Sequence, residues 1–315
     1  MDIYKNHEKN RNISLIESGW FNNDPGDGEF EGHNHKFVLK NSDNNFFHPI
    51  LKEVKDYYKF NDIPWWKGNE PTGYTLSSQI ACLNHLFYLR YDKEAVLAVL
   101  SSFSNNFTDV LQIVTDKYKP AYISFEQTSD TDLLSEGKPA RGSICTTIDA
   151  FIYALHRDGS KWLIPIEWKY IESYDDMDKG KGTLGEVRRI RYDELIKKSS
   201  QLIFDDILNG RNCYYFEPFY QLMRQTLWAE QMICFNKVET ISADNFMHIH
   251  VIPRNNVDLL EKKYPCSKKI MPNTWRRCLV DQSKYKIVNP HTLLSNLGHK
   301  YDALKQYLSA RYWSE

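Results

Sequence analysis

Hydrophobic and polar residues alternate with a strand-like period in the middle of the chain. The stretch from Ile144 to Leu155 is mostly apolar, and Lys161 to Tyr170 repeats the pattern after a short polar interruption. That interruption, Arg157-Asp158-Gly159-Ser160, favours a tight turn, because Asp-Gly supplies the positive φ that short hairpin loops need. The pattern therefore predicts two adjacent strands joined as a hairpin.

Helical periodicity flanks this hairpin on both sides. Apolar residues at helical spacing predict helices at residues 76–90, 93–103 and 217–234, the last of them strongly amphipathic. Short apolar runs predict further strands at 122–127 and 245–252. The expected order is helix–strand–strand–strand–helix–strand.

The ends of the chain differ from this middle part. Residues 1–75 are polar and rich in turn-forming residues, which predicts an irregular N-terminal extension. Residues 175–191 are expected to form a polar connection, and 257–315 a helical extension packed on the core. The predicted fold class is α/β: a core at 76–256 with a central mixed sheet of at least four strands, flanked by helices and decorated by both extensions.

Composition narrows the class of protein. A chain of 315 residues with 42% hydrophobic and 14% aromatic residues can bury a substantial core. Its formal net charge of -1 means that any nucleic-acid contact must come from a local basic patch. No apolar signal core opens the chain, and no apolar run of about 18 residues occurs, so we expect a soluble cytoplasmic protein. The cysteines show no Cys-x-x-Cys pair, which predicts scattered reduced thiols: Cys82, Cys145, Cys213, Cys234, Cys266 and Cys278.

The predicted hairpin carries the most informative polar residues. Asp149 lies on its first strand, and Glu167 and Lys169 lie two residues apart at the end of its second strand, so both point to one face. Two carboxylates and an ammonium group meeting there can hold a divalent cation and activate a water molecule, as in metal-dependent phosphodiesterases. The Glu-x-Lys pattern occurs four times in the chain, and only Glu167 ends a buried-looking strand that follows an acid-bearing one. A surface ion pair is the alternative interpretation.

The order of elements, together with three segments, resembles the PD-(D/E)XK nuclease superfamily, and most closely a little-characterised bacterial branch of restriction endonucleases. The segments are 146–150, 166–174 and 215–225, and residues 77–84 on the first helix are also similar to that branch. One departure is Ile148, where many members of the superfamily have Pro before the first acid.

This resemblance implies a role for each residue of the hairpin motif. Asp149 and Glu167 would bind Mg²⁺ or Mn²⁺, with the Trp168 carbonyl as a further oxygen ligand. Lys169 would act on the attacking water as a base or stabilise charge on the pentacovalent phosphorane, and the sequence leaves both roles open. The implied activity is that of a Mg-dependent endonuclease that cleaves DNA, in restriction or defence.

Four further polar residues are candidates for the same site. Many members of the superfamily add a glutamate from the first helix, where this chain offers only Gln79. Glu126 on the first strand is the expected substitute, and a surface carboxylate is the alternative. Gln221 and Gln225 fall where related nucleases place a glutamine, although solvated side chains on an amphipathic helix would look the same.

DNA is the expected partner, because phosphate contacts need grouped Lys or Arg side chains near the cleft. The candidate group lies in the polar connection, where a merely solvated charged segment is the alternative, and consists of Lys179, Lys181, Arg188, Arg189 and Arg191. Double-strand cutting often requires a homodimer, but no interface can be named from the sequence.

Two other functions are compatible with the sequence. The same fold could serve as a catalytically inactive nucleic-acid-binding or assembly module, since fold does not fix function. His248 and His250 also resemble the active-site strand of histidine-triad nucleotide hydrolases, although Phe246 replaces the first histidine of that motif.

Overall fold

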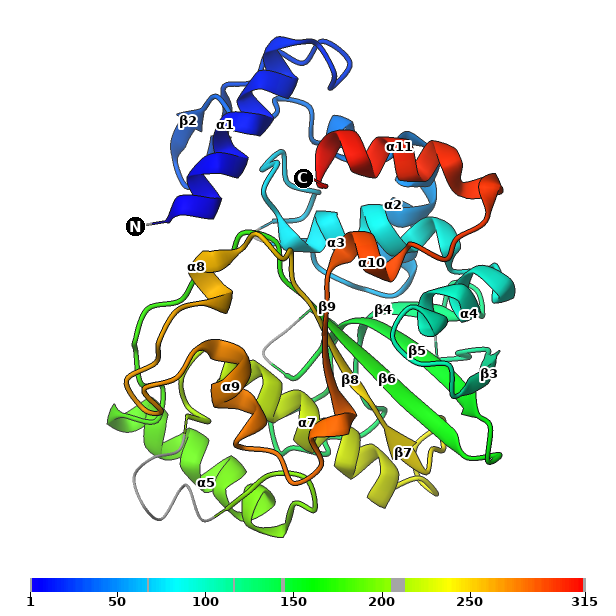
Figure 1. Cartoon of the computed structure of the whole chain (residues 1–315), viewed down its shortest axis with the longest axis vertical. Coiled ribbons are helices and arrows are strands. Elements are labelled where there is room, and N and C mark those ends of the chain that lie inside the picture. The colour runs from blue at the N-terminus through cyan, green and yellow to red at the C-terminus, as the bar shows by residue number, and fades with distance from the viewer. Residues whose placement is uncertain (1, 67, 116, 143–144, 205–212, 314–315) are drawn as a thin grey trace.

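The computed structural model describes residues 2–66, 68–115, 117–142, 145–204 and 213–313. A mixed sheet, with seven strands in the described ranges, forms the centre, and helices cover both of its faces (Figure 1). The strand order is β3-β5-β6-β8-β9, with β4 also paired to β5 and β7 to β6. This confirms the predicted α/β class with a central mixed sheet.

The sheet is antiparallel on one side and parallel on the other. Strands β3, β4 and β6 run antiparallel to β5, whereas β7 and β8 run parallel to β6, and β9 runs parallel to β8. The strand bounds are β3 Phe107–Leu111, β4 Ile123–Gln127, β5 Ile148–His156, β6 Lys161–Trp168, β7 Asn245–Phe246, β8 His248–Val251 and β9 Tyr285–Val288.

The hairpin of β5 and β6 forms as expected. Gly159 has a φ of 86°, which supplies the left-handed turn, and Asp158 accepts a hydrogen bond from the Ser160 backbone at 2.9 Å. The first strand begins at Ile148, and Ile144, where the apolar run starts, lies outside the described residues.

Successive side chains along the strands pack alternately into two separate hydrophobic layers, one on each face of the sheet. Ala150 and Ile152 face one layer, which contains helices α3 (Ser78–Leu86) and α4 (Lys93–Ser101). Phe151 and Tyr153 face the other layer, which contains helix α7 (Phe219–Cys234). The period of two along a strand thus decides which helix each side chain meets.

The N-terminal segment is more regular than the sequence analysis expected. Residues Ile3–Glu17 form helix α1, and Leu51–Phe60 form α2. The face of α1 that packs against the protein carries buried Glu8 and Asn12 as well as Tyr4 and Ile16. Because half of this face is polar, the helix lacks the apolar period on which the prediction depended.

The polar connection also proved to be helical. Helix α5 spans Gly182–Lys198 and packs against α7, where Tyr192 and Ile196 are buried. Leu184, Val187 and Ile190 instead point to solvent, so the apolar residues of this helix do not form one core-facing stripe. The sequence predicted a polar connection here and gave no indication of this helix.

The C-terminal segment contributes β9 to the central sheet, a strand that the sequence analysis did not expect. The end of helix α11 (Asp302–Arg311) contacts the middle of α1, where Arg11 donates to the backbone carbonyl of Arg311. The remaining short elements are β1 Gly28–Phe30, β2 His33–His35, α8 Val257–Leu260, α9 Met271–Arg276, α10 Pro290–Leu293 and α11 Asp302–Arg311, with the 3₁₀ turns Ser42–Asn45, His48–Ile50, Phe87–Leu89, Gln282–Lys284 and His299–Tyr301.

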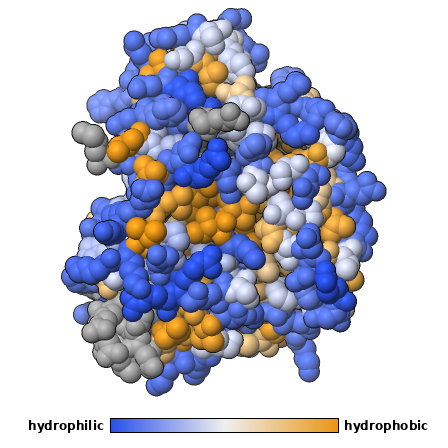
Figure 2. All heavy atoms as spheres, viewed as in Figure 1, coloured by the Kyte–Doolittle hydropathy of each residue, from blue (hydrophilic) through white to orange (hydrophobic). Residues whose placement is uncertain are grey.

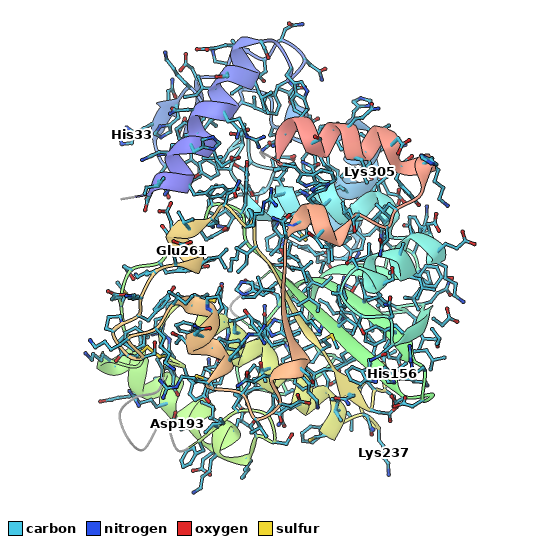
Figure 3. All side chains as sticks on the ribbon, in the orientation of Figure 1. His33, His156, Asp193, Lys237, Glu261 and Lys305 are labelled. Atoms are coloured by element: carbon cyan, nitrogen blue, oxygen red, sulfur yellow. A yellow bond between two sulfur atoms is a disulfide. The ribbon has the colours of Figure 1, made fainter. Side chains whose placement is uncertain are left out.

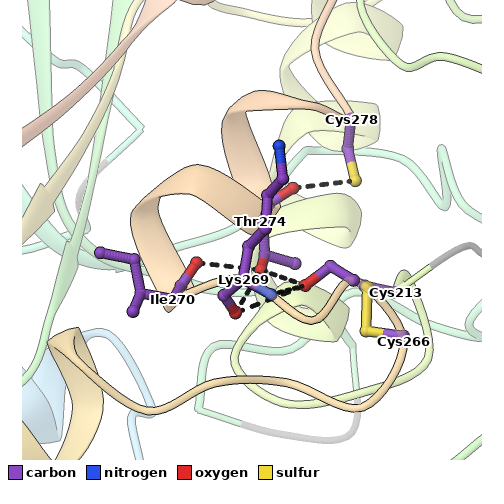
Figure 4. Close-up of a disulfide and its surroundings, with 7 residues drawn as sticks. Cys213, Cys266, Lys269, Ile270, Thr274 and Cys278 are labelled. Carbon is purple, nitrogen blue, oxygen red and sulfur yellow. Dashed lines mark hydrogen bonds between the residues drawn. A yellow bond between two sulfur atoms is a disulfide. The ribbon is translucent and has the colours of Figure 1, made fainter.

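One pair of cysteines contradicts the expectation of reduced thiols. Cys213 and Cys266 form a disulfide with a Cα–Cα distance of 5.7 Å, which ties the segment before α7 to the loop before α9 (Figure 4). Thr274 of α9 donates to the Lys269 and Ile270 carbonyls beside it. Spacing along the sequence gave no sign of this pair, since 53 residues separate the two cysteines.

The face shown in Figure 2 is mostly hydrophilic, and hydrophobic residues gather near its centre, beside β9 of Figure 1. Each helix in the described ranges is too short or too polar to cross a membrane.

Candidate active site

Strand pairing brings the predicted acids together. Ala150 pairs with Ile166, so the adjacent residues Asp149 and Glu167 lie opposite each other on the same face of the sheet. Pairing of β4 with β5 places Glu126 across from Asp149 in the same way. Three carboxylates thus lie in a row across three neighbouring strands.

A cavity of about 430 Å³ opens over this row. It is lined by all the predicted catalytic residues and by the predicted carbonyl ligand, which lie on β4, β5, β6, α3 and α7: Gln79, Glu126, Asp149, Glu167, Trp168, Lys169 and Gln221. Gln225 does not line the cavity but contacts Glu167, which does.

Asp149 is held by the neighbouring strand. Its Oδ2 accepts a hydrogen bond from the Trp168 backbone at 2.7 Å, which fixes one oxygen. Burial raises the pKa of Asp149 well above its usual value, and the charges of Glu167 and Glu126 raise it further. Without a metal ion, the site therefore favours the protonated form of Asp149.

Glu167 is fixed from two sides and is 3% exposed. Its Oε1 lies 2.6 Å from the Lys169 ammonium, and its Oε2 accepts a hydrogen bond from Gln225. Gln225 also donates to the Thr147 carbonyl at 3.2 Å, so helix α7 links Glu167 to the start of β5. Such contacts hold a side chain in one orientation, as a reactive site requires.

Lys169 is buried among these acids at the end of β6. Its ammonium donates to Gln221 at 2.5 Å and lies 5.4 Å from the centre of the Tyr174 ring. Burial acts to lower the pKa of Lys169, but the carboxylate of Glu167 and its neighbours outweigh it and raise that pKa well above the usual value. The ammonium group therefore stays charged.

Glu126 has an unusual backbone. Its φ of 50° lies in the left-handed region that residues other than glycine rarely adopt. Gln79 of α3 donates to its carboxylate at 2.9 Å, and burial raises its pKa. Backbone strain of this kind clusters at functional sites, which supports the choice of Glu126 as the third acid.

Oxygen donors make up the candidate metal ligands. Asp149 and Glu167 would supply carboxylate oxygens and Trp168 a backbone carbonyl, a set suited to Mg²⁺ or Mn²⁺. Among the described residues, no three Asp, Glu, His or Cys side chains are grouped as a complete metal site. Two carboxylates and one carbonyl would fit a cation such as Mg²⁺, which keeps several of its water molecules.

The predicted DNA-binding residues lie outside this cavity, around α5. Arg188 donates to the Lys179 carbonyl at 2.8 Å, and Arg189 donates to the Gly180 carbonyl at 2.9 Å, so both guanidinium groups hold the turn before the helix. Lys179 pairs with Glu217, whereas Lys181 is exposed. The last of the five, Arg191, stacks over the Tyr192 ring at 5.8 Å.

The histidine pair does not line the cavity either, although the pairing of β6 with β8 puts His250 beside Glu167. His248 and His250 are buried on β8, and His250 hydrogen-bonds to the Tyr285 hydroxyl at 2.8 Å. Burial lowers the pKa of His248 to about 4. A nucleophilic histidine needs access to its substrate, and this placement does not offer it.

The sequence analysis missed several residues of the cavity wall. They come from α1, from the loop before α3 and from the segment after β6: Lys5, Trp66, Tyr74, Leu76, Ser77, Ser78, Ile171, Glu172, Ser173 and Tyr174. Lys5 lies far from the hairpin in sequence, so no local pattern could have placed it there. Tyr174 was within reach of prediction, because it follows Lys169 by five residues.

The mixed α/β fold with helices on both faces of a central mixed sheet is consistent with a restriction-endonuclease-like protein. Residues 14–313 match the family described as Restriction Endonuclease associating with ARP. This chain belongs to that family, which indicates a nuclease-related role. No curated protein and no solved structure matches it.

Proposed function

We propose that this protein is a metal-dependent endonuclease of the PD-(D/E)XK type that hydrolyses DNA phosphodiester bonds, in restriction or defence. One observation carries the proposal: Asp149, Glu167 and Lys169 line the same cavity, with the two acids opposite each other on adjacent strands. Family membership supports a nuclease role independently of this geometry.

The charge of the site supports a divalent cation as cofactor. Glu126, Asp149 and Glu167 face one buried ammonium, Lys169, and burial together with mutual repulsion raises the pKa of Asp149. When bound, Mg²⁺ or Mn²⁺ would lower the pKa of a coordinated water and offset charge on the phosphate. Asp149, Glu167 and the Trp168 carbonyl are the proposed ligands.

Lys169 is proposed to stabilise charge rather than to bind the cofactor. Its ammonium is directed by Glu167 and Gln221, which leaves it beside the carboxylates that would hold the metal. A fixed cation in a water-poor site favours the extra negative charge of the phosphorane over that of the ground state. Gln221 and Gln225 would position Lys169 and Glu167 from helix α7.

Cleavage of plasmid and single-stranded DNA, measured with Mg²⁺, with Mn²⁺ and with EDTA, tests the proposal. Glu167→Gln should abolish cleavage, and EDTA should abolish it in the wild type. Glu261→Gln is the matched control, because Glu261 starts another Glu-x-Lys sequence and is exposed, so this variant should cut like the wild type. Equal nicking by Glu167→Gln would indicate contamination and leave the binding-module alternative.

A further inference from the structure

Three aromatic rings gather at one wall of the acid-lined cavity. The Phe30 ring stacks on Tyr74 with 4.3 Å between centroids and an interplanar angle of 17°, and on Trp66 at 5.6 Å and 28°. Trp66 and Tyr74 both line the cavity, and Trp66 is 41% exposed. An exposed indole beside an active site is a flat apolar surface that solvent reaches.

This aromatic cluster of Phe30, Trp66 and Tyr74 is tied directly to the catalytic carboxylates. Gln79 accepts a hydrogen bond from the Trp66 backbone at 3.2 Å and donates to the Glu126 carboxylate at 2.9 Å. The Gln79 side chain therefore links the backbone of Trp66 to the carboxylate of Glu126. Trp66, Glu126 and Asp149 line one cavity, so a base stacked on the indole would share that cavity with a group bound at the carboxylates.

Further rings and cations continue this surface outward. His35 stacks toward Phe37 at 5.0 Å, and the Lys9 ammonium lies 5.2 Å from the Phe37 ring centre. Lys5, on the same helix as Lys9, lines the cavity itself. His33 projects from the tip of the β1–β2 hairpin at the edge of the molecule (Figure 3). Rings interleaved with cations are typical of surfaces that bind single-stranded nucleic acid.

We propose that the aromatic cluster stacks an unpaired nucleobase whose phosphodiester lies at the carboxylates, so that the substrate is single-stranded or locally unpaired. This inference rests on the proposed nuclease function and adds a substrate class to it. In a duplex both faces of each base are already stacked on neighbouring base pairs, whereas an unpaired base offers a free face to an indole. Lys5 is placed to contact the flanking phosphate.

The carboxylates around Tyr74 favour a substrate that is held by stacking of its base rather than by attraction of its phosphate alone. Burial, with help from the carboxylates of Glu172 and Glu31, raises the pKa of Tyr74 to about 12, so this ring stays neutral. An acidic wall repels phosphate, and stacking of the base adds an attraction that this repulsion does not oppose, beside the charge of Lys5. Every base has a π face, so the contact is tolerant of sequence.

The test measures binding of a labelled single-stranded oligodeoxynucleotide, its oligoribonucleotide equivalent and the matching duplex, in EDTA so that nothing is cut. Trp66→Ala should weaken binding of at least one single strand by roughly 5- to 160-fold, the range for loss of one base–aromatic stack. Duplex binding should change by less than about twofold. Trp66→Phe keeps a ring and should retain most of the affinity, which separates stacking from misfolding.

Phe235→Ala is the matched control, because Phe235 is similarly exposed, at 47%, but lies at the far end of α7. It should bind every probe like the wild type. Unchanged single-strand binding by Trp66→Ala, or an equal loss with the duplex, would overturn the inference.

If Trp66→Ala loses single-strand binding while the wild type cuts nothing, the base-stacking site stands and the nuclease function fails. If the wild type cuts DNA and Trp66→Ala binds single strands unchanged, the nuclease function stands and the base-stacking site fails.

Discussion

Asp149 and Glu167 form a cross-strand pair of carboxyl groups on β5 and β6, the two middle strands of the sheet. Opposed carboxylates on neighbouring strands normally destabilise a sheet, and here Glu167 is buried and Asp149 half-buried. A fold keeps such a pair when something else offsets the repulsion. The proposed cation and the Lys169 ammonium are the two groups placed to do so.

Neutralising one acid should therefore stabilise the metal-free protein while destroying its function. In EDTA, Asp149→Asn should raise the melting temperature by roughly a few degrees, because the folded state disfavours the charged form of this group. Mg²⁺ at about 100 times its dissociation constant should stabilise the wild type by about 2.7 kcal/mol and the variant far less. Calorimetry with and without Mg²⁺ measures both effects. A lower melting temperature of the variant in EDTA would contradict the repulsion.

Removing the Lys169 ammonium should lower the stability of the protein, the opposite of the effect expected for Asp149→Asn. Lys169→Ala leaves Glu167 buried without its partner, so we expect a loss of about 3–5 kcal/mol in unfolding free energy. Turnover should fall much more than the apparent affinity for Mg²⁺, since Lys169 is not a proposed ligand. Lys55→Ala, which breaks a half-exposed pair with Asp43, is the control and should cost at most about 1 kcal/mol. Comparable losses in the two variants would argue against a buried ion pair.

The basic residues near α5 allow a test of where DNA binds. Replacing Arg188 and Arg189 with Gln should weaken DNA binding and flatten its salt dependence, and it should also lower stability, because both side chains bond to the preceding turn. Lys181→Gln isolates the charge effect, since Lys181 is exposed, and should reduce the salt slope by about one. Fluorescence anisotropy over a range of salt concentrations gives both slopes. If the salt dependence of DNA binding were unchanged in all variants, the DNA-binding surface would have to lie elsewhere on the protein.

Buried His85 predicts a pH dependence of stability. Its Nδ1 bonds to the Ala81 carbonyl at 2.7 Å and its Nε2 accepts from Trp313 at 3.1 Å, so a second ring proton would displace a bond. Burial lowers its pKa to about 3, compared with 6.5 in the unfolded chain. As pH falls below 6.5 the unfolded state gains a proton that the folded state does not, and stability is lost down to about pH 3.

Between pH 7 and pH 5 this one group should account for about 2 kcal/mol of the loss. Urea unfolding of the wild type and of His85→Gln at both pH values isolates the contribution, since all other groups are shared. The variant should lose less stability than the wild type over this range. Equal losses would mean that His85 takes up its proton in the folded state.

The disulfide predicts a stability difference between oxidised and reduced protein. Closing the loop between Cys213 and Cys266, 53 residues apart, should contribute up to about 4 kcal/mol by limiting the unfolded chain. Replacing both cysteines with serine should lower the unfolding free energy by about 2–4 kcal/mol. Cys234→Ser, at an exposed free cysteine, should have little effect. Insensitivity of the wild type to reductant would show that the bond does not form in solution.

Asp149, Glu167 and Lys169 could be found from the sequence, because strand alternation and turn chemistry, which act over a few residues, decide where they lie. Period-two alternation put Glu167 and Lys169 on one face, and the Asp-Gly turn brought the strand of Asp149 beside them. Helix α7 was recognisable because its buried face is apolar, whereas α1 was not, because Glu8 and Asn12 stand on its buried face.

The sequence by itself determined the class of the fold, the hairpin and the residue types that give the site its chemistry. Only the tertiary structure decided what surrounds them: Lys5 and Trp66 reach the cavity from segments far from the hairpin, Cys213 meets Cys266, and β9 joins the sheet. The physical reason is the range of the interactions. Side-chain period and turn chemistry act over a few residues, whereas packing of distant segments depends on the summed burial of the whole chain.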